Sequence, residues 1–293
     1  MSLRRLEAAL VRAALAVLRR LGPVAASNLC GAVARRIGPL LPVSRVATHN
    51  LSLALPELDA AARRRMVRGV WDNLGRTMGE LPHVASLRQT AAGPGWELEG
   101  ASTMHALAAQ GGPVLFFSAH IGNWEMLPVV AAHYGLQVSS LYRAASNPLI
   151  DETILALRRQ ALGPDAPMFP KGAAGARQVL AHLARGGVLG MLVDQKMNDG
   201  IEARLFGRPA MTAPALATLA LRFHCPVVPA HVERLGPARF RLVCEPPLDV
   251  PHSSDRAADV AALTQRVNDR IELWIRARPQ EWLWLHRRWP RDQ

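Results

Sequence analysis

The sequence has few cysteines, and they are not arranged in pairs. The chain contains three, Cys30, Cys225 and Cys244, with no Cys-x-x-Cys spacing among them. This pattern argues against a disulfide framework and against a cysteine-based zinc site. We therefore expect these residues to act as small buried apolar side chains in a protein of a reducing compartment.

Lysine and aromatic residues are also scarce, although the chain is strongly basic. The formal net charge is +12, and the 35 lysines and arginines include only two lysines, Lys171 and Lys196. Such a charge indicates an acidic partner or surface. Aromatic residues make up 5% of the chain, and no zinc-finger spacing or aromatic RNA-binding signature is present, so we expect no nucleic-acid partner. A basic protein that binds membranes or nucleic acid without catalysis is the alternative from a different functional class.

No apolar run is long enough for a conventional transmembrane helix. Arg12, Arg19 and Arg20 interrupt the N-terminal candidate and Pro23 follows it, whereas a spanning helix needs about 20 mostly apolar residues. Arg12 also interrupts a secretory apolar region, and no convincing cleavage site follows. We therefore expect the chain to stay in the cytoplasm and to lie on a membrane.

The N-terminal region is basic and amphipathic. Residues 1–50 contain one acid, Glu7, and eight arginines: Arg4, Arg5, Arg12, Arg19, Arg20, Arg35, Arg36 and Arg45. On a helix, an apolar face opposite Arg5, Arg12 and Arg19 would carry Leu3, Leu6, Leu10, Ala14, Val17 and Leu21. We expect residues 1–36 to form a helical region on an anionic membrane surface, with arginines toward the head groups. A surface helix docked on the protein's own core is the alternative.

Short apolar runs alternate with helical patterns after about residue 95. The runs are VLFFS (114–118), VSSLY (138–142), VLGMLV (188–193) and PVVPAHVE (226–233), and RFRLVCE (239–245) indicates a hairpin. Helices are expected at 57–85, near 124–134, 148–162, 173–185 and 212–223, and at 254–278. This order predicts an α/β fold, a mainly parallel twisted sheet flanked by helices, with a helical N-terminal layer. Residues 1–293 are expected to form a single domain.

Polar residues with catalytic potential gather in AHIGNWE (119–125). His120 would lie just past the C-terminal end of a strand, where α/β folds place reacting groups, and Glu125 in the first turn of the next helix. Gly122 would permit the sharp turn that brings them together. A carboxylate bonded to one imidazole nitrogen leaves the other nitrogen as a general base toward a hydroxyl. A half-buried structural histidine beside a helix-start carboxylate is the alternative.

Two other chemistries fit these residues less well. Ser118 and His120 share a strand face, as in a serine hydrolase, but the chain has no Gly-x-Ser-x-Gly elbow. A metal site needs more ligands than His120 and Glu125, and the other histidines show no His-Glu-x-x-His or similar spacing. We expect neither a metal nor a cofactor.

AHIGNWE and several further segments resemble one enzyme family. His-x4-Glu is the motif of the glycerolipid and lysophospholipid acyltransferase superfamily, and the GNWE ending is similar to its lipid A biosynthesis branch, the lauroyl and myristoyl transferases. Further similar segments follow in order along nearly the whole chain: THNLSLALPEL (48–58), SLYRAASNP (140–148), MLVDQKMNDGIEARLFGRPAMT (191–212), VVP (227–229) and PQEWLWLHRRW (279–289). The resemblance implies a glycerol-3-phosphate-acyltransferase-like fold.

The resemblance also implies an activity. His120 would deprotonate an acceptor hydroxyl, with Glu125 orienting its ring, for attack on the thioester of an acyl carrier protein. The acceptor would be a lipid A precursor, or another glycolipid or aminolipid, at the cytoplasmic face of the bacterial inner membrane. Asn123 and Arg143 are expected to donate hydrogen bonds to the oxyanion. Asp194 and Gln195, at a strand end, are expected to line the substrate site, and Arg208 to pair with a phosphate of the acceptor.

Three segments need separate interpretation. EARLFG (202–207) departs from the family pattern and puts Glu202 and Arg204 where the acyl chain or acceptor approaches. FPKGAAGAR (169–177) resembles the superfamily's phosphate-binding block only superficially, with Lys171 near the mouth of the site. WLWLH (282–286) fits either a membrane interface or a strand of the core, and we favour the strand.

Overall fold

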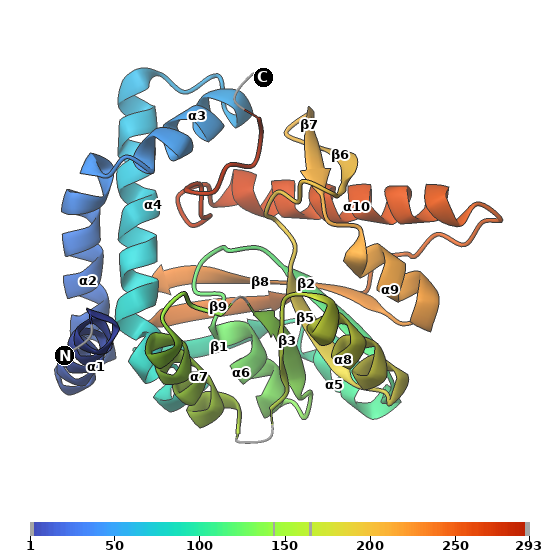
Figure 1. Cartoon of the computed structure of the whole chain (residues 1–293), viewed down its shortest axis with the longest axis horizontal. Coiled ribbons are helices and arrows are strands. Elements are labelled where there is room, and N and C mark those ends of the chain that lie inside the picture. The colour runs from blue at the N-terminus through green and yellow to red at the C-terminus, as the bar shows by residue number, and fades with distance from the viewer. Residues whose placement is uncertain (1–2, 143, 164–165, 291–293) are drawn as a thin grey trace.

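A mainly parallel seven-stranded sheet forms the centre of the structure, a computed structural model that describes residues 3–142, 144–163 and 166–290 (Figure 1). The strand order is β1-β9-β8-β2-β5-β3-β4, and only the β8–β9 pair is antiparallel among these described strands. The strands are β1 (Gly95–Glu99), β2 (Val114–Ser118), β3 (Val138–Tyr142), β4 (Met168–Pro170), β5 (Val188–Leu192), β8 (Val227–Gly236) and β9 (Arg239–Cys244). The predicted α/β class is confirmed.

Helices cover both faces of the sheet. Phe116 of β2 packs with Met104 and Ala131, which belong to α5 (Ala101–Gln110) and α6 (Met126–His133). Its neighbour Phe117 faces the other side and packs with α8 (Ala173–Ala184), α9 (Ala215–Phe223) and α10 (Arg256–Ala277). The remaining helix of the first face, α7 (Pro148–Leu162), packs beside α6. Alternation along β2 thus divides the core into two layers.

Strands β2 and β5 lie side by side, but the chain leaves them in different directions. After β2 it passes through α6 to β3, whereas after β5 it passes through the hairpin β6 (Ile201–Leu205) and β7 (Arg208–Thr212) and then α9 to β8. Such a reversal opens a crevice beyond the carboxyl ends of the two strands, which is where open α/β sheets bind ligands.

A helical layer precedes the sheet, on the left in Figure 1. It consists of α1 (Leu3–Leu21), α2 (Pro23–Ile37), the 3-10 turn η1 (Gly38–Leu40), α3 (Ser44–Ala54), α4 (Ala60–Glu80) and the 3-10 turn η2 (Leu81–Ser86). Gly75 and Gly79 of α4 let it approach α2, because a Cβ would lie 2.3 Å from Cys30 O and 2.5 Å from Ala26 O respectively. α4 therefore joins the N-terminal layer tightly.

The described part of the expected N-terminal helical region, residues 3–36, is helical but consists of two helices. Gly22 adopts a left-handed conformation (φ 76°) and Pro23 begins α2, so the chain bends there. The predicted apolar stripe faces outward: Leu3, Leu10 and Val17 are 72%, 62% and 56% exposed. The stripe therefore does not pack on the protein's own core, as the alternative interpretation required. None of the helices within the described ranges combines the length and apolarity needed to cross a bilayer.

The arginines of α1 do not all point to solvent. Arg12 Nε donates to Thr153 Oγ1 (3.2 Å) and Arg19 Nη2 to Gln160 Oε1 (3.3 Å), both on α7. Two of the side chains expected to meet head groups therefore hold α1 on the sheet domain instead. The outward surface of α1 carries its apolar stripe together with exposed arginines such as Arg4, Arg5 and Arg20.

Several sequence-based boundaries agree with the structure and others do not. The expected helices at 57–85 and 212–223 are shorter, since η2 continues α4 as a 3-10 turn and Thr212 ends β7. WLWLH is not a strand: beyond an isolated bridge from Trp282 to Ile121 it forms turns. Its tryptophans are nevertheless core residues, with Trp282 2% and Trp284 0% exposed, so burial was predicted correctly and the strand was wrong.

The cysteines behave largely as expected. Cys225 and Cys244 are buried and Cys30 is half-buried, and all three are free thiols. Burial raises the pKa of Cys225 to about 11 and that of Cys244 to about 12. At neutral pH these two residues are therefore inert apolar side chains.

Candidate active site

His120 and Asp194 meet at the carboxyl ends of two adjacent strands. Ser118 and Leu192 end β2 and β5 in register, and His120 and Asp194 each follow two residues later. Asp194 Oδ1 accepts from His120 Nδ1 at 2.8 Å, and its Oδ2 accepts from the His120 backbone N–H at 3.0 Å. Trp282 Nε1 donates to the same Oδ2 at 2.8 Å. Because Nδ1 donates to a carboxylate, Nε2 is the basic nitrogen of the ring.

The charge states follow from this pair. Burial lowers the pKa of His120, but the charge of Asp194 and its hydrogen bond outweigh burial, so the pKa lies above its ordinary value. Burial raises the pKa of Asp194, but the charge and hydrogen bonds of His120 bring it down to about 2. Asp194 is therefore ionised at neutral pH and stabilises an imidazolium.

The turn after His120 is anchored to α4. Gly122 has φ 60°, and a Cβ there would lie 2.2 Å from Val232 O, so only glycine fits this turn. Its carbonyl accepts from Asn73 Nδ2 and Thr77 Oγ1, each at 3.1 Å. Its N–H donates to Glu281 O at 3.1 Å, so it is already engaged rather than directed at a substrate.

A buried carboxylate, Glu80, supports the same turn. It is 0% exposed and accepts hydrogen bonds from Ser27 Oγ (2.7 Å), Asn123 Nδ2 (2.9 Å) and the Ala238 N–H (3.0 Å). Arg234 completes the site with an ion pair to Glu80. No sequence motif marks this cluster, because its members come from α2, α4, β8 and two loops.

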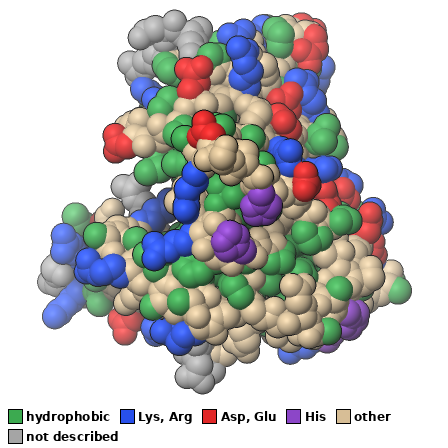
Figure 2. Space-filling view, turned by 90° about the vertical axis from the view of Figure 1, so that its right-hand side faces the viewer, with side chains coloured by type: hydrophobic (Ala, Val, Ile, Leu, Met, Phe, Trp, Pro, Cys, Tyr) green, Lys and Arg blue, Asp and Glu red, His purple; other side chains and the backbone are tan. Residues whose placement is uncertain are grey.

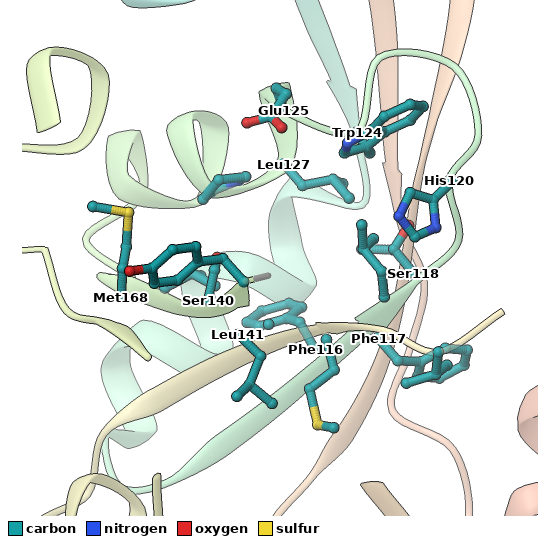
Figure 3. A pocket seen from close by; sticks show the side chains of 18 of the residues that line it. Phe116, Phe117, Ser118, His120, Trp124, Glu125, Leu127, Ser140, Leu141 and Met168 are labelled. Atoms are coloured by element: carbon teal, nitrogen blue, oxygen red, sulfur yellow. The ribbon is translucent and has the colours of Figure 1, made fainter. Parts of the chain in front are cut away.

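Glu125 is paired with an arginine rather than with His120. Its carboxylate accepts from Arg158 Nη2 at 2.7 Å and from Arg158 Nε at 3.0 Å, a bidentate geometry. In Figure 3 the carboxylate points away from the imidazole, with Trp124 between them. The expected orienting role of Glu125 is filled by Asp194, because the turn at Gly122 carries Glu125 to the start of α6, where it faces α7.

A large cavity of about 1160 Å³ opens beside His120. This volume is just above the roughly 300–1,000 Å³ of ordinary small-molecule sites. Most lining residues are apolar, among them Phe116, Leu127, Leu141 and Met168 (Figure 3). Charged and polar side chains also line it: Glu125, Arg158, Lys171, Gln195, Lys196 and His286. Figure 2 shows histidine and basic side chains gathered on one face, above a mostly hydrophobic area.

The other predicted site residues are distributed unevenly. Gln195 lines the cavity, as do Ser118 and Lys171. Asn123 does not line it, because its side chain is 0% exposed and bonded to Glu80. Arg208, on β7, does not line the cavity, and its Nε donates to Leu53 O at 2.9 Å. Arg143 lies outside the described residues.

The hairpin carrying EARLFG is also away from the cavity. Neither Glu202 nor Arg204 lines it, and Arg204 Nη1 donates to Gly207 O at 3.0 Å. The structure adds His286 and Arg158, which sequence reasoning did not select. His286 Nε2 accepts from the Lys196 N–H at 2.9 Å, and burial lowers the pKa of His286. Among the described residues, His, Cys, Asp and Glu side chains form no group of three or more suited to a metal ion.

Comparisons with known proteins give a consistent family assignment. The sequence model of the family described as bacterial lipid A biosynthesis acyltransferase matches residues 1–291. The chain is 28% identical over 192 residues to a phosphatidylinositol mannoside acyltransferase of Mycobacterium tuberculosis, a match that covers 64% of this chain but only 57% of that protein. It is 23% identical over 246 residues to the lipid A biosynthesis myristoyltransferase of Escherichia coli, covering 82% of this chain and 73% of that one. Among solved structures, the 1-acyl-sn-glycerophosphate (LPA) acyltransferase of Thermotoga maritima aligns with 81% of this chain and 98% of its own, at TM-score 0.37 and 10% identity.

Proposed function

Because the chain belongs to the bacterial lipid A biosynthesis acyltransferase family, we propose that it transfers a fatty acyl chain from the thioester of acyl carrier protein to a hydroxyl of a lipid A precursor. One observation carries the proposal: the imidazole of His120, held by a buried carboxylate, stands at the mouth of a large apolar cavity. The base meets the hydroxyl there, and the cavity holds the acyl chain.

The reaction needs one general base and no cofactor. Nε2 of His120 takes the proton of the acceptor hydroxyl while its oxygen attacks the thioester carbonyl carbon. The tetrahedral intermediate collapses with cleavage of the C–S bond, and the imidazolium returns the proton to the leaving thiolate. The products are an ester and the free thiol of the carrier. Asp194 positions the ring and stabilises the imidazolium throughout.

The negative charge of the intermediate requires nearby donors. Lys171 and Gln195 are the proposed donors, because both line the cavity with His120 and the charge of Lys171 acts on His120. Arg143 follows β3 in sequence and is a further candidate. The N–H of Gly122 is less suited, because Glu281 O already accepts from it.

A second acceptor class is favoured by one observation. The mycobacterial relative is named for acylation of phosphatidylinositol mannoside, so the same fold serves a glycolipid other than lipid A. The alternative is therefore acyl transfer to another phosphorylated glycolipid, with the same base and the same donor chemistry.

The enzyme is proposed to work as a peripheral protein on the cytoplasmic face of the inner membrane. The exposed apolar stripe of α1 supports this, together with exposed Leu29, Val33 and Ile37 of α2. α1 packs on α7 and η2, and Leu81 and Leu157 of those elements line the cavity. A lipid held in the bilayer would thus be close to the base.

The substrate assignment is tested by a matched set of transfer assays with the full chain. Labelled acyl carrier protein thioester is offered with a lipid A precursor, with a phosphatidylinositol mannoside, or with neither. Transfer to the lipid A precursor in preference to the mannoside is the expected result. Preference for the mannoside supports the alternative acceptor, and thioester cleavage without ester formation on any glycolipid rejects both.

A further inference from the structure

We propose that Gly190 of β5 sets the length of the acyl chain that the cavity admits. The inference rests on the proposed function, since the chain is taken to enter with its thioester at His120. Gly190 lies in the cavity wall on a central strand and contributes no side chain to it. The occupant is the acyl chain of the donor.

The α6-facing side of β5 is open although β5 lies between β2 and β3. Leu189 and Met191 face the other layer and are 0% and 9% exposed, and Met191 also borders the cavity, which reaches that layer as well. Gly190 is only half-buried, and Leu192 is 38% exposed, and both line the cavity. Central strands are normally buried on both faces, so this exposure marks space inside the fold.

Gly190 leaves a gap in a row of side chains. It pairs in register with Phe116 of β2 and with Ser140 of β3, so the three residues point toward α6 together. Phe116 and Ser140 both line the cavity. Across the sheet, the large side chain of Phe116 is followed by Gly190, which has no side chain, and by the small side chain of Ser140. This arrangement leaves a channel along β5.

The next row is less accessible from the cavity, because only Val138 of its three residues lines it. Val188 pairs with Val114 and Val138, so three valines lie side by side below Gly190. Val138 lines the cavity, whereas Val114 is 1% exposed. From the row of Ser118 and Leu192 to the row of Val114 and Val188, the strands advance roughly 13 Å at about 3.3 Å per residue. This depth is available to a chain whose reacting end lies at His120.

Backbone conformation does not require glycine at this position, because its φ lies outside the left-handed region. A Cβ would instead lie 2.8 Å from Val138 Cγ1 and 3.7 Å from Ser139 O. The first clash is with the side chain of Val138, which lines the cavity and would have to shift to make room. A methyl group here therefore shortens the channel, and a larger side chain blocks it.

The donor chain is the better occupant of this channel. The thioester carbon must stand beside Nε2 of His120, so its hydrocarbon tail enters the cavity from that end. The chains of a bilayer-held acceptor would have to leave the bilayer completely to reach the valine row. The channel therefore measures the chain being transferred.

The test compares unaltered enzyme with Gly190→Ala and Gly190→Val, using acyl carrier protein thioesters from octanoyl to stearoyl and one fixed acceptor. The expected result is a fall of roughly tenfold or more in kcat/KM for the longest donor that the unaltered enzyme uses, with shorter donors little affected. Gly236→Ala is the matched control, because its Cβ would meet nothing closer than Arg239 Cβ at 3.9 Å and it does not line the cavity. Ser140→Val fills the same gap from β3 and replaces the glycine variants if they do not fold.

One further measurement separates this inference from the proposed function. Thermal shifts with a ladder of free fatty acids, without acceptor, report chain-length preference independently of transfer. A preference for shorter acids in Gly190→Ala supports the inference even if no glycolipid is acylated. The inference would be overturned if the variant kept the same preference among donor chain lengths but changed its dependence on the acceptor's own acyl chains. An equal loss of kcat/KM for all donors in a folded variant would also overturn it.

Discussion

Asp194 and His120 are separated by 74 positions in the chain, yet Asp194 Oδ1 lies 2.8 Å from His120 Nδ1. Their meeting depends on the β2–β5 pairing, which sets the ends of both strands level. The backbone N–H of His120 and the indole of Trp282 hold the other oxygen of Asp194. The carboxylate is therefore fixed before substrate binds, which is the preorganisation a positioning residue needs.

Replacing Asp194 by asparagine should impair the base without removing it. We expect kcat to fall roughly 100- to 10,000-fold, because the amide no longer selects the correct tautomer or stabilises the imidazolium. The pH dependence of kcat/KM should change as well. Activity rises as His120 loses its proton, and Asp194 raises that pKa, so the midpoint should move to lower pH in Asp194→Asn. Asp249→Asn, at a side chain 91% exposed, is the control. A full-rate variant with an unmoved midpoint would exclude this role for Asp194.

Glu125→Gln should act differently from Asp194→Asn. The substitution weakens the ion pair with Arg158 at the cavity mouth but leaves the His120–Asp194 bond intact. We expect KM for the acceptor to change more than kcat, and Arg158→Met should have the same effect. Steady-state kinetics of both variants and of the double variant provide the measurement. A loss of kcat in Glu125→Gln equal to that in Asp194→Asn would show that Glu125 takes part directly in the chemistry.

Glu80→Gln should destabilise the fold strongly. The carboxylate is fully buried and paired with Arg234, and removing one partner of such a pair costs roughly 3–5 kcal/mol. Urea unfolding followed by circular dichroism measures the loss. Asp249→Asn breaks the exposed pair with Arg266 and should cost about 1 kcal/mol or less. Similar losses in the two variants would show that the Glu80 cluster contributes little.

The outward stripe of α1 should be needed for membrane binding. Leu10→Glu and Val17→Glu alter side chains that are 62% and 56% exposed, so the fold should persist. Each should weaken binding to anionic liposomes about tenfold or more, since burying such a side chain is worth roughly 1.5–3 kcal/mol. Leu235→Glu, at a 38% exposed position on β8, is the control. Undiminished flotation of the α1 variants would assign membrane contact to another surface.

The strands of the sheet could be read from sequence more easily than the site. VLFFS and VSSLY are short β-branched or aromatic runs with clear flanks, and β2 and β3 occupy those residues. Their order in the sheet could not be read in the same way. β5 lies between β2 and β3 through long-range pairings that no local pattern specifies, and the His120–Asp194 contact follows from this order. Asp194 was selected from its strand end, but its partner was not foreseen.

Local spacing was misleading where a distant residue competes. Glu125 follows His120 by five positions, which suggested a local pair, but Arg158 of α7 binds its carboxylate. The alternation of tryptophan and leucine in WLWLH suggested a strand. The segment forms turns instead, and a turn enclosed by the core can bury its tryptophans and partly bury its leucines. The β6–β7 hairpin was missed because Phe206 turns with φ 54°, a conformation that its residue type rarely adopts.

The central claim, that Nε2 of His120 is the base for acyl transfer, is tested most directly with His120→Ala. Labelled acyl chain is transferred from acyl carrier protein to a lipid A precursor by the unaltered and the substituted protein in the same detergent, after circular dichroism has verified that both are folded. We predict a loss of several orders of magnitude in the variant, with donor binding retained because the apolar cavity is unaltered. Transfer at an undiminished rate by folded His120→Ala would contradict the mechanism.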